Sequence, residues 1–356
     1  MALFWSLVEP AGGGPARPTV VASPVELTTV TDDGAVFHQG ESVLRVEGLR
    51  PDTEYEHHGV AFRTLPRPGA RLATVATVND VHFGETECGI IEGLDIGPIL
   101  RAEEGEPPYP ETMNRAAVEE IAAFDPDAVV AKGDLTTHGQ TPEYEAFLAA
   151  YGEAFGDRLH HVRGNHDAYF GETFAAFPTQ EVTVDGVTLA VLDTVIPGQS
   201  NGQVTAYQLE WLDELGARAD RPVLVFGHHH VWSPQSRTRA DTYFGIRPDD
   251  SEALIAVFAR RPALRGYFAG HTHRNRVRRF PVTGDVPFVE VACVKDFPGA
   301  WAEYRVHEGG ILQVHHRIST PAALSWTERT RAMFGGSYPK YAFGRLDERC
   351  FAITTT

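Results

Sequence analysis

Five short segments of the sequence combine histidine, aspartate or asparagine, and each follows a run of apolar residues. They occupy residues 79–82, 133–134, 164–167, 227–230 and 270–273. Imidazole nitrogens with carboxylate and amide oxygens, and without thiolates, form a ligand set that suits Mn²⁺, Fe or Zn²⁺. The five segments therefore predict a site for metal ions.

The number of candidate ligands indicates how many ions the site holds. Seven side chains qualify, namely Asp80, His82, Asp134, Asn165, His228, His271 and His273. In extended backbone, residues i and i+2 point to the same face, so Asp80 and His82 can direct two ligands to one side. One ion rarely needs seven ligands, whereas two ions about 3.5–4 Å apart, bridged by a carboxylate and a hydroxide, would use them. We therefore expect a dinuclear site.

The elements that must position these side chains follow from the surrounding pattern. An apolar strand precedes each segment, and helical spacing is found over 111–124, 141–155, 205–218 and 252–262. Thr141 is the expected N-cap of the second helix, with Pro142 in its first turn. Strands alternating with helices predict an α/β layered domain, and a hairpin around Asp185-Gly186 makes its sheets mixed rather than purely parallel. Because ligands bind beyond the carboxyl ends of strands in such sheets, the five segments can converge.

The two ends of the chain have other patterns. Residues 17–66 contain short strand-like runs separated by Asp-Gly, Gly and Pro-Asp, without a helical period, which predicts a small β-sandwich. Residues 71–317 are the expected catalytic domain, in which 84–110 form an active-site loop or cap. Residues 318–356 are a C-terminal extension that packs over the catalytic domain or over a partner subunit, and the sequence leaves both possibilities open, as it leaves open a dimer.

Composition bears on the partners and the location that we expect for the protein. The formal net charge is −17, which disfavours a long nucleic acid because such binding depends on basic patches. A small anionic substrate is still compatible, because bound metal ions can invert the charge inside a pocket. No run of about 18 apolar residues is present, so no membrane span is expected. Three widely spaced cysteines, Cys88, Cys293 and Cys350, predict free thiols near the surface and a cytoplasmic location.

The ordered blocks D-x-H, GD, GNHD, GH and GHTH resemble those of the calcineurin-like metallophosphoesterase superfamily over roughly residues 71–300. Within it, the blocks look most like those of class III cyclic nucleotide phosphodiesterases and related bacterial phosphodiesterases. The resemblance implies a layered fold of mixed β-sheets sandwiched by helices, with two metal ions. It assigns seven ligands: Asp80, His82 and His273 to the first ion, Asn165, His228 and His271 to the second, and Asp134 to both.

The same resemblance implies a role for residues that are not ligands. His166 looks like the catalytic histidine that contacts the phosphate and assists departure of the leaving group. His229 is the alternative to His228, because the triple histidine leaves that alignment ambiguous. Asp167, expected to orient a histidine, and His138 are further candidates for contacts to ligands or substrate.

The N-terminal region is similar to the fibronectin type III-like domain that precedes the catalytic domain of purple acid phosphatases. The catalytic blocks depart from those enzymes. Here Asp80-Val81-His82 pairs an aspartate with a histidine, and Thr137 stands where the purple enzymes place a metal-binding tyrosine. The iron–tyrosinate colour is therefore not expected.

The expected function is that of a phosphodiesterase acting on a small diester such as a cyclic nucleotide or a glycerophosphodiester. The alternatives are a phosphomonoesterase using the same site, an N-terminal module that binds a partner, and a metal-binding protein without turnover. Four aromatic residues near the blocks either shape the substrate pocket or pack in the core: Phe83, Tyr169, Phe170 and Trp232.

Overall fold

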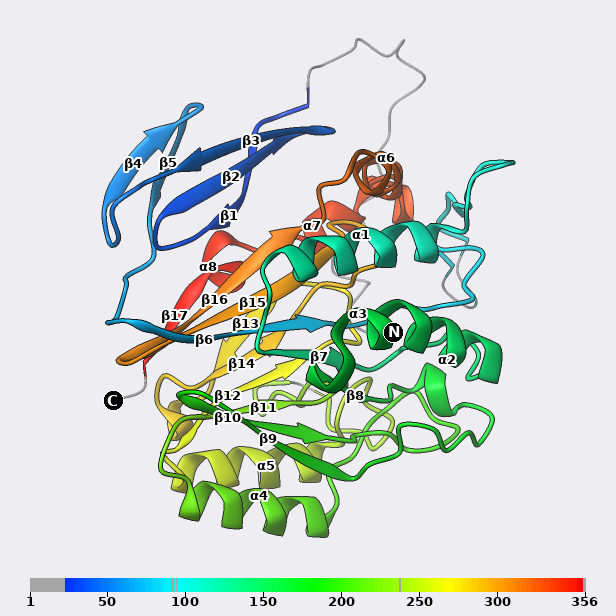
Figure 1. Ribbon diagram of the computed structural model, residues 1–356. Helices are drawn as coiled ribbons and strands as arrows, with labels where there is room; N and C mark the ends of the chain where they lie inside the picture. The colour runs from blue at the N-terminus through cyan, green and yellow to red at the C-terminus, as the bar shows by residue number, and fades with distance from the viewer. Residues whose placement is uncertain (1–22, 91–92, 94, 237, 355–356) are drawn as a thin grey trace.

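The computed structural model describes residues 23–90, 93, 95–236 and 238–354. Two six-stranded sheets form its centre (Figure 1). The first has the order β17 (Phe351–Thr354), β16 (Gly310–Arg317), β15 (Ala300–His307), β6 (Arg71–Val78), β7 (Ala128–Lys132) and β8 (Leu159–Val162). The second has the order β13 (Arg276–Arg279), β14 (Pro287–Glu290), β12 (Leu264–Ala269), β11 (Val223–Phe226), β10 (Val187–Leu192) and β9 (Thr179–Val184).

The strands that carry the five blocks run parallel within each sheet. β6, β7 and β8 are parallel neighbours, and so are β10, β11, β12 and β14, whereas β15 and β9 run antiparallel to their neighbours. The prediction of mixed sheets is confirmed. β7 and β11 are buried along their whole length, since each has a strand on both sides in a sheet that is covered on both faces.

A hydrophobic layer joins the two sheets. Val75 and Val130 of the first sheet pack in one cluster with Phe226 and Phe268 of the second. Removing apolar surface from water contributes roughly 25 cal/mol per Å², so this layer is a main source of stability. It fixes the two sheets face to face and thereby fixes the relative position of their carboxyl ends.

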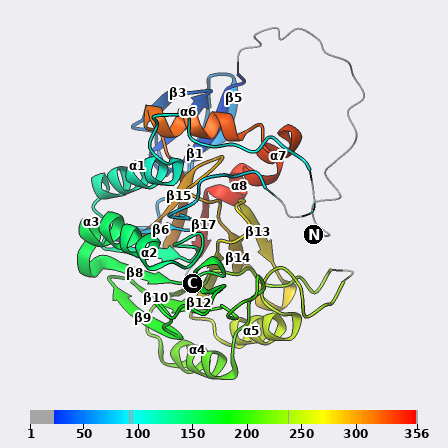
Figure 2. The same cartoon turned by 90° about the vertical axis from the view of Figure 1, so that its right-hand side faces the viewer.

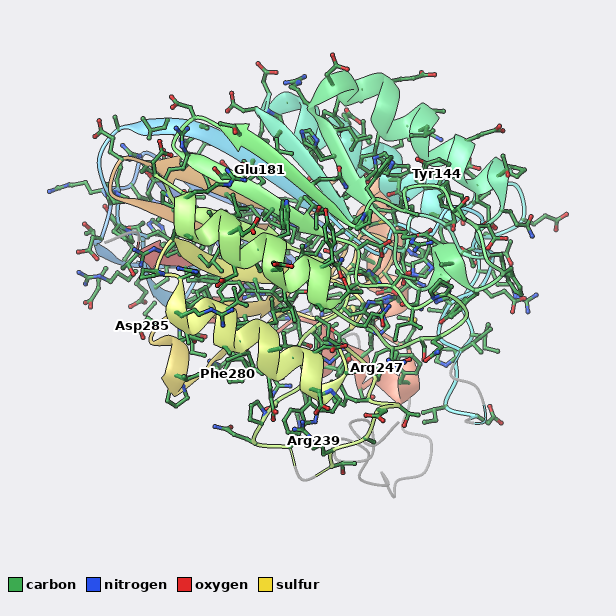
Figure 3. All side chains as sticks on the ribbon, turned by 90° about the horizontal axis from the view of Figure 1, so that it is seen from below. Tyr144, Glu181, Arg239, Arg247, Phe280 and Asp285 are labelled. Carbon is green, nitrogen blue, oxygen red and sulfur yellow. The ribbon has the colours of Figure 1, made fainter. Side chains whose placement is uncertain are left out.

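Helices cover the outer faces. α1 (Tyr109–Ala123), α2 (Thr141–Phe147) and α3 (Glu153–Phe155) lie over the first sheet, and α4 (Ala206–Arg218) and α5 (Pro248–Arg260) over the second (Figure 2). Seen from below, α4 and α5 lie side by side, with Arg247 directly before α5 (Figure 3).

The predicted helix over 141–155 needs two corrections. A π-helical turn at Leu148–Gly152 separates α2 from α3. Gln140 is the N-cap and Thr141 the first helical residue, because Glu143 accepts hydrogen bonds from the backbone N–H groups of Gln140 and His138. Pro142 does lie in the first turn, as expected.

The N-terminal region forms five strands. β1 (Glu26–Val30), β2 (Gly34–Gln39) and β3 (Ser42–Glu47) make an antiparallel sheet, and β4 (Glu54–His57) and β5 (Val60–Arg63) make a hairpin. The part of the expected module before residue 23 lies outside the described residues. Phe37 and Val30 pack in one cluster with Leu312 and Val314 of β16, so the module shares a core with the first sheet.

The C-terminal segment packs on the same chain's catalytic layers. α6 (Pro321–Thr330), α7 (Tyr338–Ala342) and α8 (Leu346–Arg349) lead into β17, which pairs with β16. All three cysteines are buried and unbridged, so the expectation of thiols near the surface is wrong. Among the described residues, no helix is both long and apolar enough to cross a membrane.

Candidate metal centre

The five blocks lie where predicted, directly after the carboxyl ends of five strands. Asp80 follows β6, Asp134 follows β7 and Asn165 follows β8, all in the first sheet. His228 follows β11 and His271 follows β12 in the second sheet. The site therefore spans the adjoining edges of both sheets.

One group of side chains gathers around Asp80. The Oδ1 atom of Asp80 lies 3.3 Å from Nε2 of His273. Ligand atoms of Asp80, His82 and His273 all lie within 4.8 Å of one another. Three side chains from two segments about 190 residues apart thus form one potential ion-binding group.

A second group gathers around His228. Its Nε2 atom lies 3.1 Å from Oδ1 of Asn165 and 3.3 Å from Oδ2 of Asp134. His271 comes within 4.8 Å of His228 as well. The same Oδ2 of Asp134 lies 3.6 Å from Nε2 of His82, so this carboxylate lies between the two groups.

The backbone at most of the candidate ligands is not extended. Five of the seven candidate ligands have φ between 47° and 66°, in the left-handed region: Asp80, His82, Asp134, His271 and His273. Non-glycine residues adopt this conformation uncommonly, and it is concentrated at functional sites. The prediction that Asp80 and His82 project from extended backbone is therefore wrong, although their side chains do converge.

Glycines before the ligands leave room for neighbouring ligands. A Cβ atom on Gly164 would lie 2.3 Å from Oδ1 of Asp134 and 2.8 Å from Cε1 of His228. A Cβ atom on Gly270 would lie 2.6 Å from Oδ2 of Asp80. Any side chain at these two positions would displace the candidate ligands from a neighbouring strand.

The donor set fits metal ions. Nε2 of His82, His229 and His271 is buried and has no hydrogen-bond partner among the described residues. An unpaired buried polar atom is costly, and a bound cation would satisfy these lone pairs. The Nδ1 atom of His228 lies 2.9 Å from the carbonyl oxygen of Lys132, which fixes its proton and leaves Nε2 as the ligand atom.

Burial and charge shift several pKa values in the site. Burial raises the pKa of Asp134, but the charges of His228 and His166 outweigh it and hold that pKa well below its usual value. Burial lowers the pKa of His228, but Asp134 outweighs it and raises that pKa to about 9. Burial lowers the pKa of Lys132 to about 7, although the charge of Asp80 acts to raise it. The centre is thus a site of strong electrostatic coupling.

His166 lies beside both groups. It begins a 3-10 turn, His166–Ala168, and its backbone N–H donates to Oδ1 of Asp134 at 2.9 Å. Its Nδ1 lies 2.9 Å from the carbonyl oxygen of Thr137. A carbonyl only accepts hydrogen bonds, so Nδ1 carries the proton and Nε2 can exchange one.

The three remaining candidates differ from expectation in part. Among the described residues, no hydrogen bond or ion pair joins the Asp167 carboxylate to a histidine. The carboxylate accepts hydrogen bonds from the backbone N–H groups of Leu135, Thr136 and Gly164, and so ties two ligand loops together. His138 is exposed, pairs with Glu143 at 3.1 Å and does not line the site cavity.

His229 belongs to the group of histidines. Its Nδ1 lies 2.8 Å from the Thr194 hydroxyl, and its ligand atom is within 4.8 Å of those of His228 and His271. The contacts of His228 with Asn165 and Asp134 favour His228 over His229 as the ligand that shares an ion with them.

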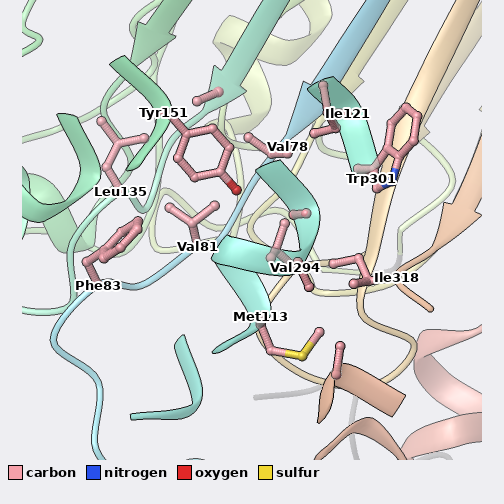
Figure 4. Close-up of a cluster of buried hydrophobic side chains, with 14 of the residues drawn as sticks. Val78, Val81, Phe83, Met113, Ile121, Leu135, Tyr151, Val294, Trp301 and Ile318 are labelled. Carbon is pink, nitrogen blue, oxygen red and sulfur yellow. The ribbon is translucent and has the colours of Figure 1, made fainter. Parts of the chain in front are cut away.

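A cavity of 320 Å³ opens over the two groups. Tyr169 lines it, whereas the other three aromatic candidates do not. Phe83 packs in a hydrophobic cluster with Tyr151 and Leu135 (Figure 4), Trp232 is buried, and Phe170 is exposed.

Sequence reasoning missed several residues that line the cavity. They are Phe244, Lys295, Asp296, Tyr338 and Tyr341, whereas Glu85 belongs to the segment 84–110 that the sequence predicts as an active-site loop or cap. Lys295 and Asp296 follow the apolar run after β14, so the pattern of an apolar strand followed by polar residues could have revealed them. The two tyrosines give no such signal, because they lie on α7 far from any block.

The missed residues hold the last ligand block in place. The Tyr338 hydroxyl donates to Oδ1 of Asp296, and Oδ2 of Asp296 lies 3.6 Å from Nδ1 of His273. The Tyr341 hydroxyl donates to the carbonyl oxygen of Thr272 at 3.0 Å. The C-terminal segment is therefore part of the site.

Two of the curated proteins that this chain resembles are phosphodiesterases by name. The chain is 31% identical over 229 residues to the cAMP/cGMP dual specificity phosphodiesterase MT0825 of Mycobacterium tuberculosis, covering 61% of this chain and 65% of that protein. It is 30% identical over 168 residues to the glycerophosphodiester phosphodiesterase GpdQ of Enterobacter lignolyticus, covering 44% and 59%. The chain thus spans less than two thirds of the length of either relative.

Similar solved structures include two phosphatases. One is a dimetal phosphatase from Danio rerio, at TM-score 0.49 and 17% identity, covering 70% of this chain and 97% of that one. Another is the purple acid phosphatase PPD1 from yellow lupin, at TM-score 0.47 and 14% identity, covering 86% and 66%. The family model of the calcineurin-like phosphoesterases matches residues 73–275, which is more than half of the chain. The protein belongs to the calcineurin-like phosphoesterase family.

Proposed function

We propose that this protein is a dinuclear metal-dependent phosphodiesterase that hydrolyses a small diester such as a cyclic nucleotide or a glycerophosphodiester. The observation that carries the proposal is the position of Asp134, whose Oδ2 lies 3.3 Å from His228 and 3.6 Å from His82. One carboxylate between two groups of nitrogen and oxygen donors is the arrangement that a pair of ions needs. The names of the two relatives supply the substrate classes.

The residues that would hold the ions follow from the two groups. Asp80, His82 and His273 would hold the first ion. Asn165, His228 and His271 would hold the second, and Asp134 would serve both. The ligand set suits Mn²⁺, Fe or Zn²⁺. When bound, such ions neutralise phosphate oxygens and lower the pKa of water from 15.7 toward about 7.

His166 is the proposed general acid. Its Nδ1 is held by the Thr137 carbonyl, which leaves Nε2 to give a proton to the departing oxygen of the ester. Positioned acid catalysis of this kind typically contributes 10²–10⁴-fold. Hydrolysis of a monoester at the same site is the second candidate, because the bound ions would contact the phosphate oxygens, which monoesters and diesters share, and not the organic substituents.

The cavity supports the preference for a diester. Its volume of 320 Å³ extends beyond the candidate ligands to Ile90, Met333 and Phe334. A pocket of about 300 Å³ or more accommodates a small organic ligand. A diester has a second organic substituent that can occupy this space, whereas a monoester has only one.

The test is hydrolysis of bis-p-nitrophenyl phosphate against p-nitrophenyl phosphate with Mn²⁺ added, together with elemental analysis. We expect about two metal ions per chain and faster turnover of the diester. Asp134→Ala and His271→Ala should abolish turnover at saturating metal, while Phe177→Ala, an exposed control, should not. Faster turnover of the monoester would move the assignment to a phosphatase, and no metal binding with no turnover would refute the proposal.

A further inference from the structure

The cavity has two unlike sides. Candidate metal ligands line one side, and the other is lined by apolar side chains that we call the apolar wall: Ile90, Phe244, Met333 and Phe334. None of these four can coordinate a hard or borderline cation through oxygen or nitrogen. The wall therefore does not coordinate the ions itself, although the Phe244 ring stacks on that of His271, with 3.9 Å between the ring centroids.

The wall is built by segments that hydrogen bonds hold together. The backbone of Cys88 exchanges two hydrogen bonds of 3.0 Å with Leu100, which closes the loop that carries Ile90. The Gly335 N–H donates to the Gly97 carbonyl at 2.9 Å, which joins that loop to the C-terminal segment. A Cβ atom on Gly89 would lie 3.3 Å from Met333, so the two segments are in close contact.

Charges near the wall are already paired. Lys295 is the one lysine or arginine among the described residues that line the cavity, and Glu85 binds it through both oxygens at 2.6 and 2.5 Å. Glu87 pairs with Arg101 at 2.8 Å. A second anionic group on a substrate would therefore meet carboxylates and no unpaired cationic side chain of the described lining.

The two tyrosine hydroxyls of the cavity lining are engaged too. The hydroxyls of Tyr338 and Tyr341 donate to Asp296 and to the Thr272 carbonyl. What the tyrosines present to the cavity is chiefly ring surface. At the same time Ile90 is 57% exposed and Phe244 is 40% exposed, which leaves apolar surface uncovered beside a polar site. Apolar side chains that line a cavity beside a few polar groups are typical of a small-molecule site.

We propose that the apolar wall binds an uncharged, apolar or aromatic arm of the diester, and that the site discriminates against diesters whose arm carries a second anion. This inference rests on the proposed function. Burial of the arm against Ile90 and Phe244 would release water from both surfaces, while an anionic arm would lose its hydration without gaining a partner.

The test uses three diesters with one leaving group, p-nitrophenol, and different arms: methyl, phenyl and 4-carboxyphenyl. Each kcat/KM is measured with the Mn²⁺-loaded full chain and divided by the diester's own rate of alkaline hydrolysis. We expect the phenyl diester to exceed the methyl diester by about tenfold, since a few apolar groups in a pocket give 10–200-fold discrimination. The 4-carboxyphenyl diester should fall at least threefold below the phenyl diester.

Two isoleucines of the same loop give a matched pair of variants. Ile90 lines the cavity, whereas Ile99 does not, and their exposures are similar at 57% and 50%. Ile90→Ala should lower the phenyl-to-methyl ratio by about threefold, and Ile99→Ala should keep the wild-type ratio. Equal rates for all three arms, or equal effects of the two variants, would overturn the inference. No turnover of any diester with two ions bound would instead overturn the proposed function, and this inference with it.

Discussion

Tyr169 accepts a hydrogen bond of 2.6 Å from Nδ2 of Asn165, and this contact decides which way the Asn165 amide faces. With Nδ2 held by the phenol, Oδ1 is directed to His228, 3.1 Å away. Only the amide oxygen has a lone pair for a cation. Tyr169 therefore positions a candidate ligand of the second ion.

Tyr169→Phe should weaken binding of the second ion by about tenfold, since residues that orient a ligand typically matter by 10–100-fold. Calorimetric titration with Mn²⁺ measures this directly, whether or not the protein turns over substrate. Phe170→Leu, at the adjacent exposed position, is the control and should bind as wild type does. Equal affinities for the Tyr169→Phe and wild-type proteins would contradict the assignment.

Tyr338→Phe should weaken binding of the first ion, by a similar factor of about ten. The phenol donates to Asp296, which lies 3.6 Å from Nδ1 of His273. Its loss leaves only the Cys293 thiol on that carboxylate oxygen, so the carboxylate, and through it the imidazole, is held less firmly. The same titration applies, with Tyr207→Phe on the exposed face of α4 as the control. If both tyrosine variants bind Mn²⁺ as wild type does, the C-terminal segment does not support the metal site.

Gly164→Ala should lower turnover by about 100-fold or more while the chain still folds. The added Cβ would lie 2.3 Å from Oδ1 of Asp134, so Asp134 must move, and misplacing a catalytic group by about 1 Å can cost 10²-fold. Gly152→Ala is the control, because its Cβ would meet only Leu148 at 3.8 Å. Circular dichroism checks folding; full activity of Gly164→Ala would show that Asp134 is not held as tightly as described.

Phe37→Ala should destabilise the whole chain by about 3–5 kcal/mol, as expected for a buried phenylalanine. Phe37 is fully buried in the cluster that joins the N-terminal module to Leu312 and Val314 of β16. Urea unfolding measures the loss, and Phe177→Ala, which is exposed, should be near neutral. A small effect confined to a separate transition would mean that the module folds independently of the catalytic layers.

His38 should make stability depend on pH. Burial, followed by the charges of Arg317 and Arg45, lowers the pKa of His38 to about 3 in the folded protein. In the unfolded chain its pKa is about 6.5, so between these values the unfolded state binds more protons. The contribution of neutral His38 is therefore present above pH 6.5 and is lost as pH falls toward 3, by about 2 kcal/mol at pH 5.

The measurement is urea unfolding between pH 7 and 5 for wild type and His38→Gln. The variant should lose less stability over this range, because glutamine does not titrate. His57→Gln, in the hairpin of the same module, is the control. Its free energy of unfolding should change with pH as that of the wild type does. If the free energy of unfolding falls equally from pH 7 to 5 in the wild-type and His38→Gln proteins, His38 does not govern the pH dependence of stability.

Much of the fold follows from local pattern. Apolar runs before each block predict β6, β7, β8, β11 and β12, and the structure has all five. Helical spacing predicts α1, α4 and α5 within a few residues. The π-helical turn at Leu148–Gly152 was missed, because its apolar positions continue the helical spacing across it. The N-cap also differs from the prediction. Residue type favours Thr141, but the Glu143 side chain accepts a hydrogen bond from the backbone N–H of Gln140 and makes Gln140 the N-cap.

For the candidate site, too, part follows from the sequence and part only from the tertiary structure. The sequence alone determined the types of donor and their order along the chain, since each block ends its own strand and carries its own histidine, aspartate or asparagine. The sequence does not reveal the left-handed backbone of Asp80 and His271, because that conformation depends on contacts with neighbouring loops. Which donors share a group, and that Asp134 lies between the groups, depends on how the two sheets pack. Likewise, only the tertiary structure brings Tyr338 beside Asp296 and Met333 into the cavity, because these contacts join segments far apart in sequence and leave no local periodicity to read.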